Sequence, residues 1–147
     1  MAHYTVAAAS TAAGVKTARM KKAIERGSIR LMHNDRSSRG TGEPHRLCRA
    51  RVIQFAITER LTEVGVKPSV AAKAAFEFSD RRATDQDAFG TSRPKVILIG
   101  LPRGVLKLVS IPPDGSIEDF LSNEPAAFVI NCSKIADQVD SLLPTQK

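Results

Sequence analysis

The sequence predicts an α+β protein in which helices and a β-hairpin come first, followed by a small α+β region of about three strands and one helix. Three observations support this prediction. Up to Val64, apolar residues recur at helical spacing between glycines. After Pro94, the runs KVILIG and VLKLVSI are rich in β-branched residues and bounded by turn residues. The length of 147 residues suits one average domain, or a small domain with an appendage.

The first segment predicts two short helices joined by a turn. Thr5 suits the N-cap of the first helix, and Gly14 suits its end because glycine tolerates a positive φ. Val15 is then expected to fill the angle between the helices. The second helix is expected to begin at Lys16 or Thr17 and to stop at the next glycine. Two helices joined by a glycine-containing turn form the helix-turn-helix pattern. The apolar stripe of the second helix comprises Met20, Ala23 and Ile24.

Residues 28–47 predict a β-hairpin with a long polar tip. The stretch SIRLM is expected to form the first strand, HNDRSSRGTGEP the tip and HRL the returning strand. A third helix is expected from about Arg49 to Val64. A fourth should begin near Pro68, because proline suits the first turn of a helix. Arg49 and Arg51 are equally compatible with contacting a partner and with simply flanking the third helix.

Residues 79–94 are polar and end in glycine and proline, which predicts a linker. Beyond it, KVILIG, VLKLVSI and AAFVINC predict three strands, and Ser133 suits the N-cap of a last helix. About fifty residues bury too little apolar surface to be stable by themselves. Residues 95–147 are therefore expected to fold against the first half or to pair with their counterpart in a dimer.

The excess positive charge lies entirely in the first third of the chain. The formal net charge is +7, and residues 1–51 hold 11 of the 22 Lys and Arg but only 3 of the 15 acids. Charge that served only solubility would be spread more evenly. This distribution favours a polyanionic partner, either a nucleic acid or an anionic membrane surface. No apolar run approaches the ~18 residues of a membrane span, and we expect no membrane contact.

Several other classes of protein are disfavoured. Cys48 and Cys132 have no paired spacing, and His33 and His45 complete no metal-ligand cluster, so we expect no metal site. No nucleophile motif or phosphate-binding glycine loop indicates an enzyme, and no cofactor is expected. The acid-free residues 1–24 resemble a transit peptide in composition. The glycines that are expected to end the two helices instead favour folded structure. We expect a cytoplasmic, nucleoid-associated protein.

The stretch YTVAAASTAAGVKTARMKKAIERGSIRL, followed by HRLCRARVIQFAITERLTEVGV, resembles the MerR superfamily of winged helix-turn-helix DNA-binding proteins. Within it, the excisionase-like and phage-type regulators are most similar. The resemblance rests especially on Gly14-Val15 and IERGSI, and covers roughly Tyr4 to Phe78. Ala23 stands where these proteins usually have an aromatic residue. The resemblance implies a DNA-binding domain over residues 1–78, leaving residues 95–147 as a dimerisation or partner-binding region.

The resemblance also implies that the second helix enters the major groove with its N-terminal residues at base edges. Arg19 is expected to pair with guanine. Lys21, four residues before Glu25, is set aside as half of an ordinary solvated ion pair. The complete expected set comprises major-groove residues Lys16, Thr17 and Arg19, phosphate contacts Lys22 and Arg26, hairpin-tip residues Arg36 and Arg39, and hairpin anchors His45 and Arg46.

The leading functional hypothesis is a sequence-specific regulator that binds double-stranded DNA as a homodimer. An architectural factor of the excisionase or partition type is a close alternative. In a third hypothesis, residues 95–147 bind a protein partner and the basic half serves as a tether. Binding to single-stranded nucleic acid is disfavoured, because Tyr4 is the only aromatic residue before Val52 and such binding depends on base stacking.

Overall fold

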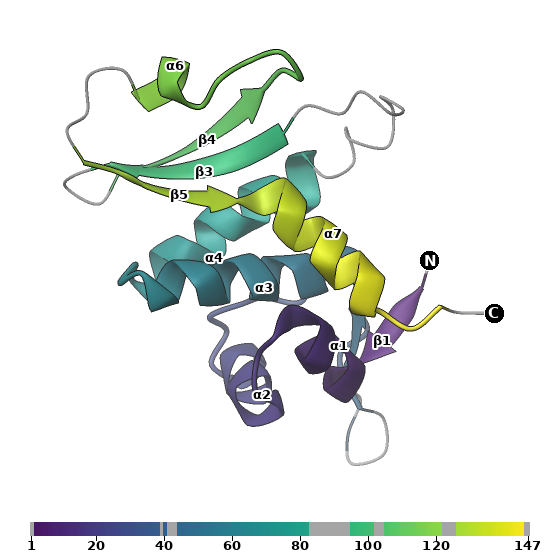
Figure 1. The fold of residues 1–147 in the computed structure, drawn as a ribbon. Coiled ribbons are helices and arrows are strands. Elements are labelled where there is room, and N and C mark those ends of the chain that lie inside the picture. Colours follow the sequence, from purple (N-terminus) through teal and green to yellow (C-terminus); the bar gives the residue numbers. More distant parts are fainter. Residues whose placement is uncertain are drawn as a thin grey trace.

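The computed structural model describes residues 2–38, 40, 44–82, 95–101, 105–121 and 126–145, without the side chains of residues 81 and 82. The protein is α+β, with a helical part, a two-stranded sheet and a three-stranded sheet (Figure 1). The elements are β1 (His3–Thr5), α1 (Val6–Ala13), α2 (Thr17–Glu25), β2 (Arg46–Cys48), α3 (Arg49–Glu63), α4 (Pro68–Phe76), the π-helical turn η1 (Glu77–Arg82), β3 (Lys95–Leu101), β4 (Val105–Ile111), α6 (Glu118–Leu121), β5 (Phe128–Asn131) and α7 (Cys132–Leu142).

The turn between α1 and α2 follows from the residues predicted to form it. The Thr5 hydroxyl caps α1 by accepting a hydrogen bond from the Ala8 amide at 3.2 Å. Gly14 has a φ of 68°, a left-handed conformation that favours glycine. Val15 is buried, as expected of a residue between two helices. The predicted N-cap and glycine stop of the first helix are thus confirmed.

The predicted hairpin is only partly correct. Residues 28–32 form no strand, because the Ser28 and Ile29 amides both donate to the carbonyl oxygen of Ala23 and thereby end α2. The returning strand is present as β2, but its antiparallel partner is β1, at the beginning of the chain. Among the described residues of the intervening segment, only Arg36 bridges to β2, through two backbone hydrogen bonds of 2.8 Å with Arg46.

The third and fourth predicted helices match the structure closely. Helix α3 begins at Arg49, and the chain turns at Gly65, whose φ is 92°. Pro68 occupies the first turn of α4, where its missing N–H costs no hydrogen bond. The two helices pack against each other, and small alanines on α4 allow close contact. The buried alanines of α4 are Ala71, Ala72 and Ala75.

The C-terminal sheet has the antiparallel order β4-β3-β5. Gly100 of β3 is opposite Phe128 of β5, and a Cβ at position 100 would lie 2.1 Å from the ring, so only glycine leaves room for it. The last helix begins two residues earlier than predicted. Asn131, not Ser133, caps α7 by accepting from the Lys134 amide at 3.0 Å, while the Ser133 hydroxyl accepts from the Val96 amide of β3.

The C-terminal region folds against the first half, which is the first of the two predicted alternatives. Helix α7 packs on both α1 and α3 (Figure 1). Its buried Cys132, Ala136 and Val139 belong to the same apolar core as the buried faces of α1, α3 and α4. Arg49 joins the two parts with a two-pronged ion pair to Asp140, whose longer bond is 2.7 Å. A second, smaller core of β3 and β4 side chains lies on the other face of the sheet.

Candidate nucleic-acid interface

Helix α2 presents a basic face to solvent. Met20 is its only fully buried side chain, and Ala23 and Ile24 are half-buried beside it. At 100° per residue, Ala18, Lys22 and Glu25 lie on the side of the helix opposite Met20, and Lys21 lies at the border of that side, about 100° from Met20. All four residues are exposed. Lys16, the exposed N-cap residue, precedes them.

The start of α2 is fixed to α1 by a hydroxyl contact. The Thr17 Oγ1 lies 2.8 Å from the Ser10 Oγ, and either group can donate. Ser10 is buried and also donates to the carbonyl oxygen of Ala7. The Thr17 hydroxyl, which the sequence assigned to DNA, therefore has a partner inside the protein. It helps to fix the angle between the two helices.

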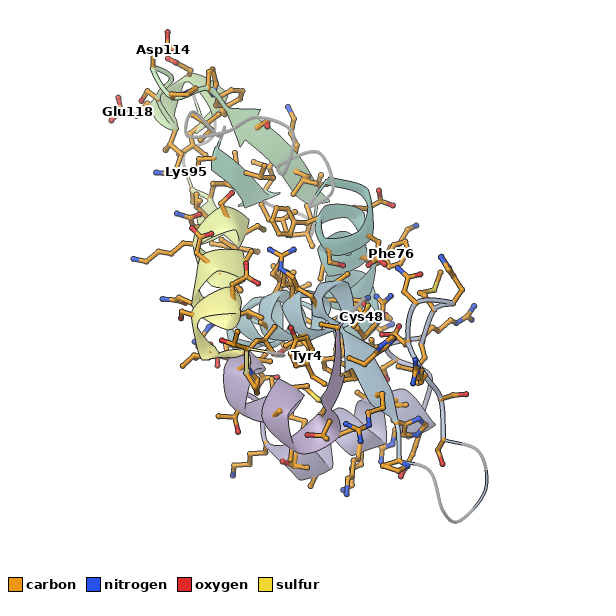
Figure 2. All side chains as sticks on the ribbon, turned by 90° about the vertical axis from the view of Figure 1, so that its right-hand side faces the viewer. Tyr4, Cys48, Phe76, Lys95, Asp114 and Glu118 are labelled. Carbon is orange, nitrogen blue, oxygen red and sulfur yellow. The ribbon has the colours of Figure 1, made fainter. Side chains whose placement is uncertain are left out.

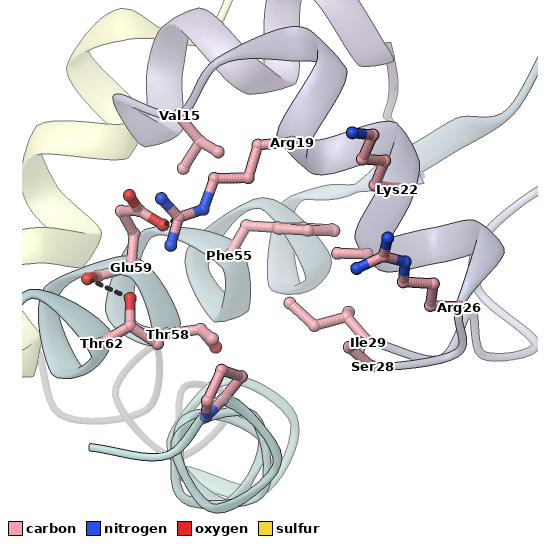
Figure 3. A pocket seen from close by; sticks show the side chains of 12 residues that line it. Val15, Arg19, Lys22, Arg26, Ser28, Ile29, Phe55, Thr58, Glu59 and Thr62 are labelled. Atoms are coloured by element: carbon pink, nitrogen blue, oxygen red, sulfur yellow. Dashed lines mark hydrogen bonds and ion pairs between the residues drawn. The ribbon is translucent and has the colours of Figure 1, made fainter. Parts of the chain in front are cut away.

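Arg19 lies on the flank of α2 that faces α3. Its Nε is 3.2 Å from a carboxylate oxygen of Glu59, and its side chain remains 58% exposed. Figure 3 shows Arg19 reaching from α2 toward Glu59. Lys22 and Arg26 line the same cavity of about 230 Å³, which we call the α2–α3 groove, with Phe55 in its lining. Three of the expected DNA contacts, Arg19, Lys22 and Arg26, thus border this groove.

On the opposite flank, α2 faces the segment that leads into β2. Thr17, Lys21 and Glu25 line a hollow of about 450 Å³ together with Ser38 and His45, which we call the α2–His45 hollow. Lys21 was set aside at the sequence level as the partner of Glu25. That ion pair is not among the salt bridges of the described residues. The signal that could have identified Lys21 is its spacing of four residues from Thr17, which puts both on one helix face.

The segment before β2 carries the remaining predicted residues. Arg36 and Arg46 are exposed and paired through their backbones. His45 is half-buried, and its Nδ1 accepts a hydrogen bond of 2.9 Å from the Ser38 amide, so its ring stabilises the segment before β2. Arg39, at the expected hairpin tip, lies outside the described residues.

A buried ion network holds the base of this segment. The fully buried Arg51 donates from Nε to Asp35 at 2.9 Å and from both terminal nitrogens to Asp80, and it also bonds the Gln54 side chain. Asp35 additionally accepts from the Met32 and Cys48 amides at 2.9 Å each. Arg51 therefore neither flanks α3 passively nor faces a partner. It joins the base of the segment before β2 to η1.

Acid should weaken this network. Burial opposes the ionisation of Asp35, but the two backbone amides and the Arg51 guanidinium outweigh it and lower its pKa below the ordinary 3.8. A carboxyl group with a lowered folded-state pKa contributes stability above its unfolded pKa and loses that stability as the pH falls through the folded value. We expect the free energy of unfolding to fall below about pH 4.

Urea unfolding of the protein and of Asp35→Asn, at pH 7 and pH 3, measures this effect. The asparagine variant should be less stable at pH 7, and the difference in free energy of unfolding between the two proteins should be smaller at pH 3. Asp137→Asn on the exposed face of α7 is the matched control. Its free energy of unfolding should differ little from that of the parent protein at either pH. If Asp35→Asn lowered the free energy of unfolding equally at both pH values, the lowered pKa assigned to Asp35 would be wrong.

Neither a metal site nor a reactive thiol is found among the described residues. The described residues contain no cluster of His, Cys, Asp or Glu suited to a metal ion. Burial raises the pKa of the Cys48 thiol to about 11 and that of Cys132 to about 12, so neither resembles a reactive thiolate. Among the helices that the structure describes, none is long and apolar enough to cross a membrane. Comparison with models of known protein families found no match, and comparison with curated proteins found none either.

Proposed function

We propose that the protein is a sequence-specific regulator that binds double-stranded DNA with α2 in the major groove, in the manner of winged helix-turn-helix proteins. The observation that carries this proposal is the exposed face of α2. Within the described part of the chain, Lys16, Lys21 and Lys22 have no ion pair or hydrogen bond from their side chains. A convex helix face with three available ammonium groups is suited to a groove lined by phosphates.

The arrangement around α2 supports the same proposal. The Ser10–Thr17 contact and the buried Val15 fix α2 relative to α1, so the basic face is preformed. Arg36 and Arg46, which are exposed and paired through their backbones, add positive charge in the segment that leads into β2. These two side chains suit the adjacent phosphates, which position a protein without specifying sequence.

The assignment of base contacts shifts from Arg19 toward Lys21. Arg19 lies on the α3 flank and is paired with Glu59, whereas Lys21 is exposed on the opposite flank, in the middle of α2, without an ion pair among the described residues. Lysine can donate to the O6 and N7 acceptors of guanine, and such a contact contributes roughly 1–3 kcal/mol of discrimination. Lys22, Arg19 and Arg26 then contact the DNA phosphates beside the α3 flank of the helix.

Selection of binding sites from a random pool of duplex DNA tests the proposal with the full chain. We expect one enriched motif for the parent protein. Lys21→Ala should relax preference at one position of that motif. Arg19→Ala should weaken binding to all sequences alike. It should also reduce the slope of log affinity against log salt concentration by about 0.9 for each phosphate that the variant no longer neutralises. Lys134→Ala, on the exposed face of α7, is the matched control and should change neither the motif nor the salt dependence of binding.

The outcomes separate the possibilities. If the parent protein enriches no motif but binds duplex DNA strongly, the sequence-specific role fails and an architectural role takes its place. Absence of duplex binding at low salt would reject both. If Arg19→Ala relaxes the base preference at one position of the motif and Lys21→Ala weakens binding to all sequences alike, Arg19 contacts a base, as the sequence predicts.

A homodimer remains part of the proposal. A single small module buries too little surface for tight specific binding, and two-fold symmetry usually supplies the second half-site. In the described residues, β4 pairs only with β3 and forms an edge of its sheet. The mass of the protein–DNA complex, measured by analytical ultracentrifugation on the selected site, should correspond to two protomers, and a single protomer would reject the dimer.

A further inference from the structure

A pocket of about 450 Å³ lies apart from the proposed DNA-binding face, between the segment after α2 and helices α3 and α4. Its lining includes Phe76, the last residue of α4, so we call it the Phe76 pocket. Figure 2 shows Phe76 on the side of the molecule opposite to α7. This cavity has no role in the proposed contact between α2 and DNA.

The rim of the Phe76 pocket is positively charged. Arg30 and Lys73 line it from opposite elements, and both are exposed. Neither side chain has an ion pair or hydrogen bond to another described residue. The hydroxyls of Ser28 and Ser69 also line the pocket, and its lining contains no Asp or Glu. The α2–α3 groove differs, because Glu59 pairs with one of its cations.

The floor of the pocket offers a buried hydrogen-bond donor. Gln54 is only 4% exposed, and its amide oxygen accepts from Arg51. Its amide nitrogen carries two hydrogens, and one bonds the carbonyl oxygen of Ala72 at 3.0 Å. The second hydrogen has no acceptor among the described residues. Because a buried donor without an acceptor is costly, an oxygen of a bound anion would be stabilised at this position.

Apolar groups complete the lining. Phe76 is half-buried, and its ring centroid lies 5.8 Å from the Arg51 guanidinium carbon. Met32 is 37% exposed, and its flexible thioether suits contact with a flat ring. Ligand sites commonly combine such apolar walls with a few convergent polar groups.

We propose that the Phe76 pocket binds a small organic anion, in which a carboxylate or phosphate is attached to a flat apolar body. The anionic group lies between Arg30 and Lys73 and accepts a hydrogen bond from the free Gln54 N–H. The apolar body contacts Phe76 and Met32. This inference does not depend on the DNA-binding proposal, since none of the residues proposed to contact DNA lines the Phe76 pocket.

Phenyl phosphate is a suitable probe because it contains both parts of the expected ligand. Calorimetric titration of the full chain without DNA should show saturable binding to one site. Inorganic phosphate and phenol, each of which supplies one part, should bind at least about tenfold more weakly. Amide chemical-shift changes should concentrate at residues 28, 69 and 73.

Two variants test the assignment of the pocket. Lys73→Gln and Arg30→Gln should each weaken phenyl phosphate binding by about tenfold, because each removes a charge-assisted hydrogen bond. Lys134→Gln is the matched control of equal charge change, outside the pocket. No saturation by phenyl phosphate at millimolar concentration would overturn the proposal. Equal weakening by all three variants would also overturn it, because binding would then reflect only net charge.

Discussion

Replacing Arg51 with methionine is expected to lower the free energy of unfolding by about 3–5 kcal/mol, the usual cost of breaking a buried ion pair. The substitution preserves much of the side-chain volume but leaves Asp35 and Asp80 without their cation. Both carboxylates are largely shielded from water, with side chains 0% and 14% exposed. The Gln54 oxygen also loses a donor. Urea unfolding followed by circular dichroism measures the loss.

Two further variants test the cause of this effect. Adding Asp35→Asn and Asp80→Asn to Arg51→Met should recover part of the lost stability, because the uncompensated charges are removed together. Arg30→Met, at an exposed position, controls for the loss of one positive charge. If Arg51→Met were no more destabilising than Arg30→Met, the buried network would contribute little to folding.

Met20→Ala is expected to cost about 2–5 kcal/mol, the range for truncating a large buried apolar side chain. Met20 is completely buried and is the only side chain of α2 with that degree of burial. Its removal should therefore loosen α2 more than the rest of the fold. Hydrogen exchange of the α2 amides, together with the denaturant midpoint, measures both consequences.

Met20→Leu is the control for this truncation, since it keeps a similar volume and should cost less than about 1.5 kcal/mol. If α2 amides exchanged no faster in Met20→Ala while the whole protein lost stability uniformly, α2 would be held by other side chains. The half-buried Ala23 and Ile24 would then be the side chains to vary next.

The sequence was sufficient to predict those elements whose boundaries depend on local residues. Thr5, Gly14 and Pro68 act on neighbouring backbone groups, so α1 and the beginning of α4 were predicted correctly. Strand β1 was missed because three residues give no recognisable alternation, and its pairing with β2 depends on residues more than forty positions away. The Ser133 cap was wrong because Asn131, two residues earlier, provides an equally suitable side chain.

The candidate site shows the same division between local and distant causes. The charge distribution located the basic helix, and helical spacing identified Met20 as its inner residue. The side on which each lysine or arginine lies could not be predicted, because it depends on elements distant in sequence. Arg19 meets Glu59 forty residues later, and Lys21 meets the hollow beside His45. Arg51 was ambiguous for the same reason, since its partners lie 16 and 29 residues away.

The packing of α7 on α1 and α3 limits how the chain can be divided. Cutting the protein after residue 94 would remove Cys132, Ala136 and Val139 from the core and would leave Arg49 without Asp140. The apolar sides of α1 and α3 would then face water in the truncated fragment. The basic half is consequently unsuited to transfer as a free-standing module. A fusion that borrows its surface would need to carry α7 as well, or polar replacements on the faces that α7 covers.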